Sequence, residues 1–561
     1  MSAVRFDLDA PRAGPSPPVA PMRWWGWGSD AQAAQLPTTA LVLLRERLGL
    51  DGARVDAPVR ITDIALPDPN LPPALLTALR KCVGEAHVHT DRLARISHAA
   101  GRSYPDLVRL RSGAVENPPD AVVMPGSAEE VARLLALASA EGIAVVPFGG
   151  GTSVVGGVEP LRGRFEVVVS LDLRRLGSLL EVDARSRLAH VEAGILGPAL
   201  ERGLAERGFA LGHYPQSFEY STVGGWVAAR SAGQASSGVG RIDDLLAGVE
   251  LASPTGTLAL PALPPNAAGP DLRRLVLGSE GVLGAITRCT LRIRPRPQAR
   301  HAEAWSLPSF EAGCAALRQL AQRRCLPDVA RLSDEQETDI SLTLASNTRA
   351  VAWLRRYLRL RGQRRPCLVV TIYEGEGDEV AWRRARCRRV LRAHGGVPLG
   401  AAPACSWERE RFRGPYLRDE LLDRGVLLET LETATTWSRL GELYGAVREA
   451  LRTALATPGS EPVVMCHVSH LYETGASLYF TFLAAVAPDE RLQRWSLAKR
   501  AACDAIVAHG GTVSHHHGVG RDHRDWLVHE DGERGLAALR ALKRELDPQG
   551  VMNPGKLLPD E

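Results

Sequence analysis

The chain has 561 residues, of which 45% are hydrophobic and 24% charged, and its formal net charge is +4. A chain of this length is too long to fold around a single hydrophobic core, so we expect a globular protein of two or more domains. A net charge this small does not indicate nucleic-acid binding. The nine cysteines form no C-x-x-C pair, so they predict neither a zinc site nor a disulfide framework.

The N-terminal region precedes any regular pattern. Residues 1 to about 20 are rich in Pro and Ala, and we expect them to be disordered. Three tryptophans follow in Arg23–Gly28, and they are either a buried anchor or a lipid-facing surface; the anchor is our interpretation. The segment 30–115 reads as mainly helical. We find no secretion signal and no apolar run of about 18 residues, so we expect a cytoplasmic protein, from a bacterium by its high Ala and Arg content.

A β-α-β pattern then begins. Ala121–Met124 is a short apolar strand, and Ser127 with Glu130 predicts a capping box at the start of a helix. Val131, Leu134, Leu135 and Ala138 would share the apolar face of this helix. The apolar run Ile143–Val146 predicts a buried strand that ends in the loop Pro147–Ser153. Later patterns predict strands over 166–171, 188–194 and 289–293 and a helix over 196–208.

The glycine-rich loop is the most informative stretch. Adjacent glycines let the backbone take positive φ and approach a ligand closely, and the N–H groups of such a turn form an anion site. Thr152 and Ser153 add hydroxyl donors, which suits a pyrophosphate. The simpler alternative is a plain tight turn. Neither G-x-G-x-x-G before a helix nor G-x-x-x-x-G-K-[ST] is present, so a nicotinamide Rossmann site or an ATP P-loop is not indicated.

Beyond Arg300 the composition becomes Arg- and Leu-rich with long helical patterns, as in a substrate or cap domain. Alternation over Leu478–Phe482 predicts a half-buried strand. Helices are expected over 491–509 and 535–546. Between them lies the triple histidine His515–His517.

The residues alone leave the chemistry of this region open. In an extended segment His515 and His517 would share one face and His516 would oppose them. A metal site needs further ligands and none stands out, so proton handling and a polar turn remain equal alternatives. Tyr479 alone would be a core tyrosine. Arg418 beside an aspartate would be a surface ion pair, although a guanidinium also binds phosphate bidentately.

Three loops carry a family resemblance. P-x-G-G-G-T-S, S-T-V-G-G-W and G-S-E-G-x-L-G-x-I-T occur in this order, beginning at Pro147, Ser221 and Gly278. The chain resembles the vanillyl-alcohol oxidase flavoprotein superfamily and, more closely, the alkyldihydroxyacetonephosphate synthase family. The resemblance implies an α+β fold with a two-part FAD-binding domain and an α/β cap domain. We expect an N-terminal extension (1–115), the FAD-binding domain (116–297), the cap domain (298–500) and a C-terminal segment that returns to the flavin (501–561).

The resemblance also implies site residues. Tyr479 and His515, His516 and His517 would be catalytic. Arg418 would bind the substrate phosphate, and Arg331 would be a second substrate-binding residue near the active site. The expected FAD-binding residues are Pro147, Phe148, Gly149, Gly150, Gly151, Thr152, Ser153, His213, Gln216, Ser217, Ser221, Thr222, Gly224, Gly225, Arg230, Ser231, Glu280, Gly281, Gly284 and Ile286. Gln216 departs from the family, which has an acidic residue there. The glycine loop contains no histidine or cysteine, so we expect non-covalent FAD. We expect no metal, because no further ligands accompany the triple histidine at a suitable spacing.

The implied reaction exchanges the acyl group of acyl-dihydroxyacetone phosphate for a long-chain fatty alcohol without net redox change. An FAD-dependent oxidase or dehydrogenase of a 2-hydroxy acid or alcohol on the same fold is the alternative. A non-catalytic lipid- or phosphate-binding protein with vestigial flavin loops is a third. The expected partners are a phosphorylated ketone and a fatty alcohol, with a homodimer, no nucleic acid, and peripheral membrane contact left open. The sequence does not locate an apolar channel.

Overall fold

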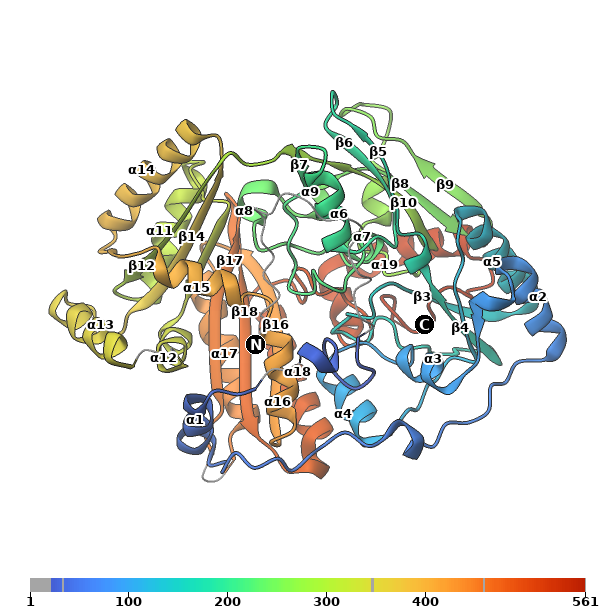
Figure 1. Ribbon diagram of the computed structural model, residues 1–561, viewed down its shortest axis with the longest axis horizontal. Helices are drawn as coiled ribbons and strands as arrows, with labels where there is room; N and C mark the ends of the chain where they lie inside the picture. The colour runs from blue at the N-terminus through green and yellow to red at the C-terminus, as the bar shows by residue number, and fades with distance from the viewer. Residues whose placement is uncertain (1–21, 33–34, 345–347, 458–459, 560–561) are drawn as a thin grey trace.

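The structure is a computed structural model that describes residues 22–32, 35–344, 348–457 and 460–559. The segment expected to be disordered lies outside these residues. Two domains lie side by side, one built around strands β1 to β10 and the other, the cap domain, around β12 to β18 (Figure 1). The C-terminal segment crosses back from the cap to the first domain.

The first domain begins with a four-stranded sheet in the order β1-β2-β4-β3, made of Val88–His89, Ala121–Val123, Val167–Asp172 and Ile143–Phe148. Strands β2, β4 and β3 are parallel. Helix α5 (Ala128–Glu141) joins β2 to β3 and buries the predicted apolar face. Ser127 caps it by accepting from the N–H of Glu130, but the Glu130 carboxylate accepts from Gly126 instead of Ser127, so the predicted capping box is half formed.

A five-stranded antiparallel sheet completes this domain and makes it two-part, as expected. Its order is β5-β6-β10-β8-β9, with bounds Leu179–Asp183, Leu188–Glu192, Ala285–Arg292, Leu246–Ser253 and Gly256–Leu260. A short pair, β7 (Phe209–Ala210) and β11 (Arg294–Pro295), lies beside it. The helices of this region are α6 (Gly197–Ala205), α7 (Val223–Ala228), α8 (Ser236–Val239), α9 (Ile242–Leu245) and α10 (Arg273–Val276). The predicted strands and helix agree with these bounds within a few residues.

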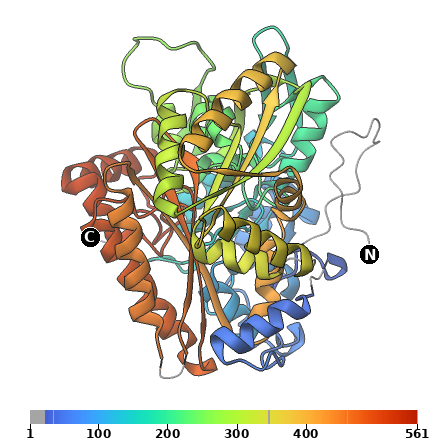
Figure 2. The same ribbon diagram turned by 90° about the vertical axis from the view of Figure 1, so that its left-hand side faces the viewer.

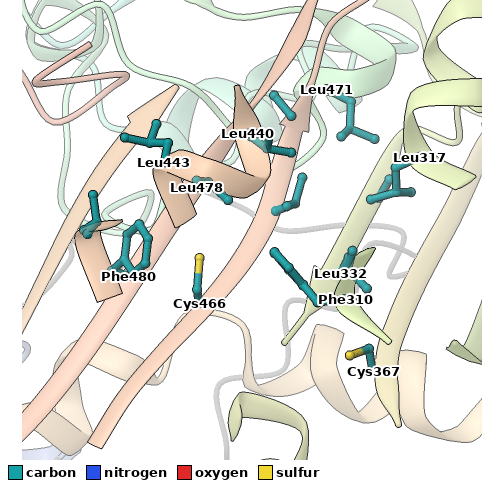
Figure 3. Packing of buried hydrophobic residues seen from close by; sticks show 14 of the residues in the cluster. Phe310, Leu317, Leu332, Cys367, Leu440, Leu443, Cys466, Leu471, Leu478 and Phe480 are labelled. Atoms are coloured by element: carbon teal, nitrogen blue, oxygen red, sulfur yellow. The ribbon is translucent and has the colours of Figure 1, made fainter. Parts of the chain in front are cut away.

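The cap domain is one seven-stranded antiparallel sheet in the order β15-β12-β14-β13-β17-β18-β16. Its strands are Val397–Gly400, Ala299–Leu307, Cys367–Gly375, Val329–Ser333, Val463–Leu471, Gly475–Ala485 and Val426–Thr436. One face packs against helices α11 (Phe310–Gln322), α14 (Gly377–Ala393), α17 (Leu440–Leu455) and α18 (Arg491–Ala508). Figure 3 shows this core, where Phe480 and Cys466 of the strands meet Leu443 of α17.

The opposite face of the cap sheet is flanked by a second set of helices, namely α12 (Glu335–Leu344), α13 (Thr348–Leu360), α15 (Ala402–Glu410) and α16 (Gly414–Leu422). Alternate strand residues point to opposite faces, so one set of side chains builds the core and the other set faces away from it. Among the described residues no helix is long and apolar enough to cross a membrane.

The two chain ends connect the domains. Helix α1 (Thr38–Leu48) packs on α12 of the cap, whereas α2 (Pro73–Val83) packs on α5; α3 (Arg92–Ser97) and α4 (Tyr104–Ser112) follow. The last helical segment, α19 (Leu527–Leu546), consists of two helices that meet at a kink at Gly532 (φ 66°), and the predicted helix corresponds to the second of them. Beyond it the backbone N–H of Asn553 donates to the carbonyl of Val145 in β3. The C-terminal segment thus lies against the strand that leads into the glycine loop.

Candidate active site

A cavity of about 1420 Å³ lies between the two domains and is lined by residues of both. Typical small-molecule sites have about 300–1,000 Å³. This cavity therefore has room for more than one ligand, such as a cofactor together with a substrate.

The glycine loop forms one wall of the cavity. All seven residues from Pro147 to Ser153 line it. Gly151 has φ +66°, and a Cβ on Gly150 would lie 1.7 Å from the carbonyl oxygen of Tyr220, so only glycine allows this approach of two backbone segments. Among the described residues, the backbone N–H groups of residues 149–152 have no protein acceptor. The loop therefore presents free donors to the cavity, which fits the pyrophosphate of FAD.

The two other loops complete this wall. Thr222 accepts from the N–H of Gly225 (3.2 Å), and Ser221 accepts from the indole N–H of Trp226 (2.7 Å). The carboxylate of Glu280 accepts from the backbone N–H groups of Val519 (2.6 Å) and Gly520 (2.7 Å). Burial raises the pKa of Glu280 to about 7. Glu280 thus ties the third flavin loop to the segment that follows the triple histidine.

Most of the expected FAD-binding residues line the cavity, and two do not. His213 is fully buried behind it, where its Nε2 lies 2.8 Å from the Ser231 hydroxyl. Arg230 points away and donates to Asp243 at 2.6 Å. Those lining the cavity are Pro147–Ser153, Gln216, Ser217, Ser221, Thr222, Gly224, Gly225, Ser231, Glu280, Gly281, Gly284 and Ile286. Neither His213 nor Arg230 reaches the space where a cofactor would lie.

The cap sheet forms the opposite wall through alternate residues of three adjacent strands. Nearest to the flavin loops, His467 of β17 pairs with Tyr479 of β18. Two residues further along the strands, the cavity is lined by the set Met465, Thr481 and Thr430. Two residues further again, it is lined by Val463, Leu483 and Leu428. The wall therefore changes from polar to apolar over four residues.

Helices close the apolar end. Leu44 of α1, Ile340 of α12 and Leu354 of α13 line the cavity there, together with Leu36, Leu43, Leu342, Leu344 and Val351. This apolar channel was not predictable from the sequence, because its wall comes from segments that are hundreds of residues apart.

Tyr479 lies among imidazoles. Its ring stacks on His467 with centroids 4.7 Å apart, and it lies 6.0 Å from His516 and 5.6 Å from His517. Burial raises the pKa of Tyr479 to about 12 and lowers the pKa of His516 and His517 to about 3. At neutral pH the phenol is therefore protonated and the imidazoles are neutral, so the site holds a proton donor beside proton acceptors. The core-tyrosine alternative does not describe Tyr479, because its ring faces the cavity.

The triple histidine is not an extended segment. It winds around the buried carboxylate of Glu432, which accepts from the backbone N–H groups of His515, His516 (2.9 Å) and His517 (2.7 Å). His516 and His517 line the cavity, whereas His515 does not. The expected pairing of His515 with His517 on one face is thus wrong, because the turn around Glu432 removes the alternation of an extended chain.

His515 lies in a hydrogen-bonded chain behind the cavity. Its Nδ1 is 2.9 Å from Nδ1 of His516, and its Nε2 is 2.7 Å from the hydroxyl of Tyr472. His470 stacks on it, and the ring nitrogens of His470, His515 and His516 lie close enough to hold a metal ion. Hydrogen bonds already engage both ring nitrogens of His515, so this geometry is that of a hydrogen-bonded chain.

Arg418 is a buried cation on the wall of the cavity. It lies on α16, lines the cavity and is 8% exposed. Among the described residues its side chain has no hydrogen bond or ion pair, and its buried Nε lacks an acceptor. Neighbouring Asp419 instead accepts from the N–H of Trp27 (2.7 Å) and from Arg23 (3.0 Å). The surface-pair alternative is therefore wrong: the N-terminal segment holds Asp419, and Arg418 is free to meet an anion in the cavity.

The tryptophan segment acts as the anchor that we expected. Trp27 is 3% exposed and packs edge-on against Tyr220 at 5.7 Å. Arg331 also lines the cavity, but it already donates to Glu337 (2.8 Å) and lies 3.0 Å from Nε2 of His467. Arg331 thus contacts His467 and Glu337, whereas Arg418 has no such contact among the described residues.

Sequence reasoning missed His467, Glu432 and Tyr472. The alternation of Val463, Met465 and His467 along β17 is visible in the sequence, but the register that brings His467 to Tyr479 is not.

Comparisons with known proteins support an FAD-binding chain. Residues 119–259 match a family described as FAD binding domain, and residues 296–557 match FAD linked oxidases, C-terminal domain. Alkyldihydroxyacetonephosphate synthase of Trypanosoma brucei brucei is 34% identical over 88% of this chain and 82% of its own length. An uncharacterised FAD-linked oxidoreductase of Escherichia coli, YgcU, is 30% identical over 87% and 99%.

A solved structure of alkyldihydroxyacetonephosphate synthase has a TM-score of 0.83 and 31% identity, and the match covers 95% of this chain and 98% of that one. The resemblance, the fold class and FAD as the cofactor are confirmed. The chain therefore belongs to the alkyldihydroxyacetonephosphate synthase family of FAD-binding proteins.

Proposed function

We propose that the protein exchanges the acyl group of acyl-dihydroxyacetone phosphate for a long-chain fatty alcohol, with no net redox change. The observation that supports this proposal most strongly is that one cavity is lined by a cation, a polar set of side chains and an apolar channel. The guanidinium of Arg418, the polar set around Tyr479 and the apolar channel lined by Leu428 share the same space. These three parts match a phosphate, a reacting centre and an alkyl chain.

Each part has a defined role. The planar Arg418 guanidinium binds the substrate phosphate through paired N–H donors. The neutral imidazoles of His516 and His517 accept a proton from the incoming alcohol, and the Tyr479 hydroxyl donates or returns one at the reacting carbon. The apolar channel excludes water from the alkyl chains and favours long ones. Bound FAD would supply an electron-accepting flavin ring.

FAD attachment is proposed to be non-covalent. Residues 147–153 contain no histidine or cysteine, so the loop that would hold the pyrophosphate offers no linking side chain. Denaturing the protein with acid should release all of the flavin into the supernatant. Flavin that stays with the precipitated protein would contradict this.

The reaction itself is tested without oxygen. Purified protein mixed with palmitoyl-dihydroxyacetone phosphate and hexadecanol should give the alkyl ether, detected by mass spectrometry, with the flavin oxidised at the end. A panel of 2-hydroxy acids and alcohols should leave the flavin absorbance unchanged. Bleaching by one of them, without ether formation, would favour the oxidase alternative instead.

A further inference from the structure

A short N-terminal turn, Arg23–Gly28, lies between the helix that carries Arg418 and the first domain. The backbone N–H of Arg23 donates to the carbonyl of Gly28 (2.8 Å) and closes the turn. In Figure 1 the darkest blue part of the chain lies between α16 of the cap domain and α4 of the first domain, and in Figure 2 it lies at the right-hand edge of the molecule. The turn is therefore placed to contact both domains at once.

The turn binds the carboxylate of Asp419 on α16. Oδ2 of Asp419 accepts from the backbone N–H of Trp27 (2.7 Å) and from the guanidinium of Arg23 (3.0 Å). Arg23 also donates to the carbonyl of Trp27 (2.6 Å), which fixes the shape of the turn. Because a buried carboxylate needs donors around it, the turn satisfies the negative charge that follows Arg418 in the helix.

Two glycines let the turn approach α16 closely. A Cβ on Gly26 would lie 2.5 Å from Oδ2 of Asp419. A Cβ on Gly28, which has φ +71°, would lie 2.2 Å from the ring of Tyr416. A larger residue at either position would push the turn away from α16, so the sequence of the turn is suited to this contact.

Arg102 binds the other side of the turn. Its buried guanidinium donates to the carbonyls of Arg23 (2.8 Å), Gly26 (3.1 Å) and Gly101 (2.7 Å). Burial lowers the pKa of Arg102 to about 10, so the group is charged at neutral pH. The backbone N–H of Arg102 donates to the carbonyl of Ser153 (2.6 Å), the last residue of the glycine loop. Arg102 thus joins the turn to the loop that fits the pyrophosphate of FAD.

We propose that Arg23 and Arg102 are positioning residues of the phosphate site, because they keep Asp419 from pairing with Arg418. Burial raises the pKa of Asp419, and Arg418 is the largest of the influences that oppose this rise. Arg418 is therefore the cation that a released Asp419 would meet. An arginine that is paired with a carboxylate has fewer N–H donors and less net charge to offer a phosphate.

This inference deepens the proposed function and rests on it, since that function places the substrate phosphate at Arg418. Neither Arg23, Arg102 nor Asp419 lines the cavity. Their substitution should therefore change phosphate binding without removing a group that touches either substrate. Because Arg102 joins the same turn to the glycine loop, the turn also relates the phosphate site of the cap domain to the pyrophosphate site of the first domain.

Calorimetric titration of the full-length, FAD-loaded protein with dihydroxyacetone phosphate tests the proposal. Arg23→Gln should weaken binding about tenfold, since Asp419 loses its charged donor. Arg23→Lys keeps a charged donor and should restore most of the affinity. Arg102→Lys should weaken binding by a similar factor, because an ammonium cannot reach three carbonyls as a planar guanidinium does. If Arg102→Lys does not fold, Arg23→Gln tests the proposal alone, since it leaves the contacts of Arg102 in place.

A second substitution tests whether the released carboxylate is the cause. Asp419→Asn added to Arg23→Gln should recover most of the affinity, because an amide can still accept from Trp27 but does not neutralise Arg418. Arg54→Gln is the charge-matched control. It removes an exposed arginine that pairs with Glu420 on the same helix (2.6 Å), and it should leave the affinity unchanged.

Turnover gives an independent measurement. In Arg23→Gln the KM for palmitoyl-dihydroxyacetone phosphate should rise about tenfold, while kcat and the KM for hexadecanol stay unchanged. A structural defect that lowered the amount of folded protein would reduce kcat instead, and it would not distinguish the two substrates.

The outcomes separate this inference from the proposed function. Unchanged affinity in Arg23→Gln, an equal loss in Arg54→Gln, or no recovery in the double variant would overturn the role of the turn. If dihydroxyacetone phosphate bound equally well to Arg418→Ala, or did not bind the unaltered protein, the phosphate site itself would be refuted and the proposed function with it.

Discussion

Blocking the apolar channel should shorten the substrates that the protein accepts. Leu428 of β16 lies four residues from Glu432, which pairs with Tyr479. At about 3.3 Å per residue, Leu428 is roughly 13 Å along the strand from the reacting end. An extended chain advances about 1.2 Å per bond, so about eleven bonds separate the two positions. Leu428→Trp would fill the channel at that depth.

The expected size of the effect follows from the length that no longer fits. About five methylenes of a palmitoyl chain lie beyond Leu428, and each buried methylene contributes about 0.8 kcal/mol. The variant should therefore lose up to about 4 kcal/mol of binding for long chains, which is roughly a thousandfold in kcat/KM. An octanoyl chain ends before the block and should react at an unchanged rate.

The assay compares palmitoyl- with octanoyl-dihydroxyacetone phosphate in the same preparation. Leu180→Trp, at a 51% exposed position in the first domain, is the matched control and should keep the preference for long chains. If Leu428→Trp lowers kcat/KM equally for both chain lengths, the fold was damaged and the channel assignment is unsupported. If it leaves both unchanged, the alkyl chain does not lie along β16.

Three further predictions concern the polar end. Arg418→Lys should raise KM for the acyl substrate about tenfold while the flavin spectrum is unchanged, because an ammonium cannot replace a bidentate guanidinium; steady-state kinetics measures this. Glu432→Gln should lower the free energy of unfolding by about 2 kcal/mol, since three backbone N–H groups lose a charged acceptor, and denaturant titration checks it. His516 and His517 have pKa values lowered to about 3, so below about pH 6.5 the unfolded state binds protons that the folded state excludes. The free energy of unfolding should fall as pH falls through this window, by about 2 kcal/mol for each at about pH 5, and His517→Gln should flatten the dependence.

Local patterns predicted the first domain well. The spacing of Val131, Leu134 and Leu135 identified α5, and the apolar run before Pro147 identified β3, since both signals lie within a few residues of one another. The glycine loop was identifiable for the same reason. The helix, the strand and the loop each depend on residues that are close together in the sequence, so the sequence alone is enough to predict them.

The cap site required long-range information. Tyr479 meets His467 through strand register, and the triple histidine takes its shape from Glu432, which is more than 80 residues away in the chain. Burial then lowers the pKa of His516 and His517 to about 3, well below the usual value for histidine. Arg418 could not be separated from a surface ion pair until the N-terminal segment was seen to hold Asp419. These contacts join residues that are far apart in the sequence, so they become visible only in the folded structure.

The central claim is that an alcohol oxygen replaces an acyloxy group in this cavity. The direct measurement uses hexadecanol carrying heavy oxygen, with unlabelled palmitoyl-dihydroxyacetone phosphate, and mass spectrometry of both products. We predict that the ether carries the heavy oxygen, that the released palmitate carries none, and that the flavin is oxidised at the end. An unlabelled ether, or flavin reduced in proportion to alcohol consumed, would contradict the exchange.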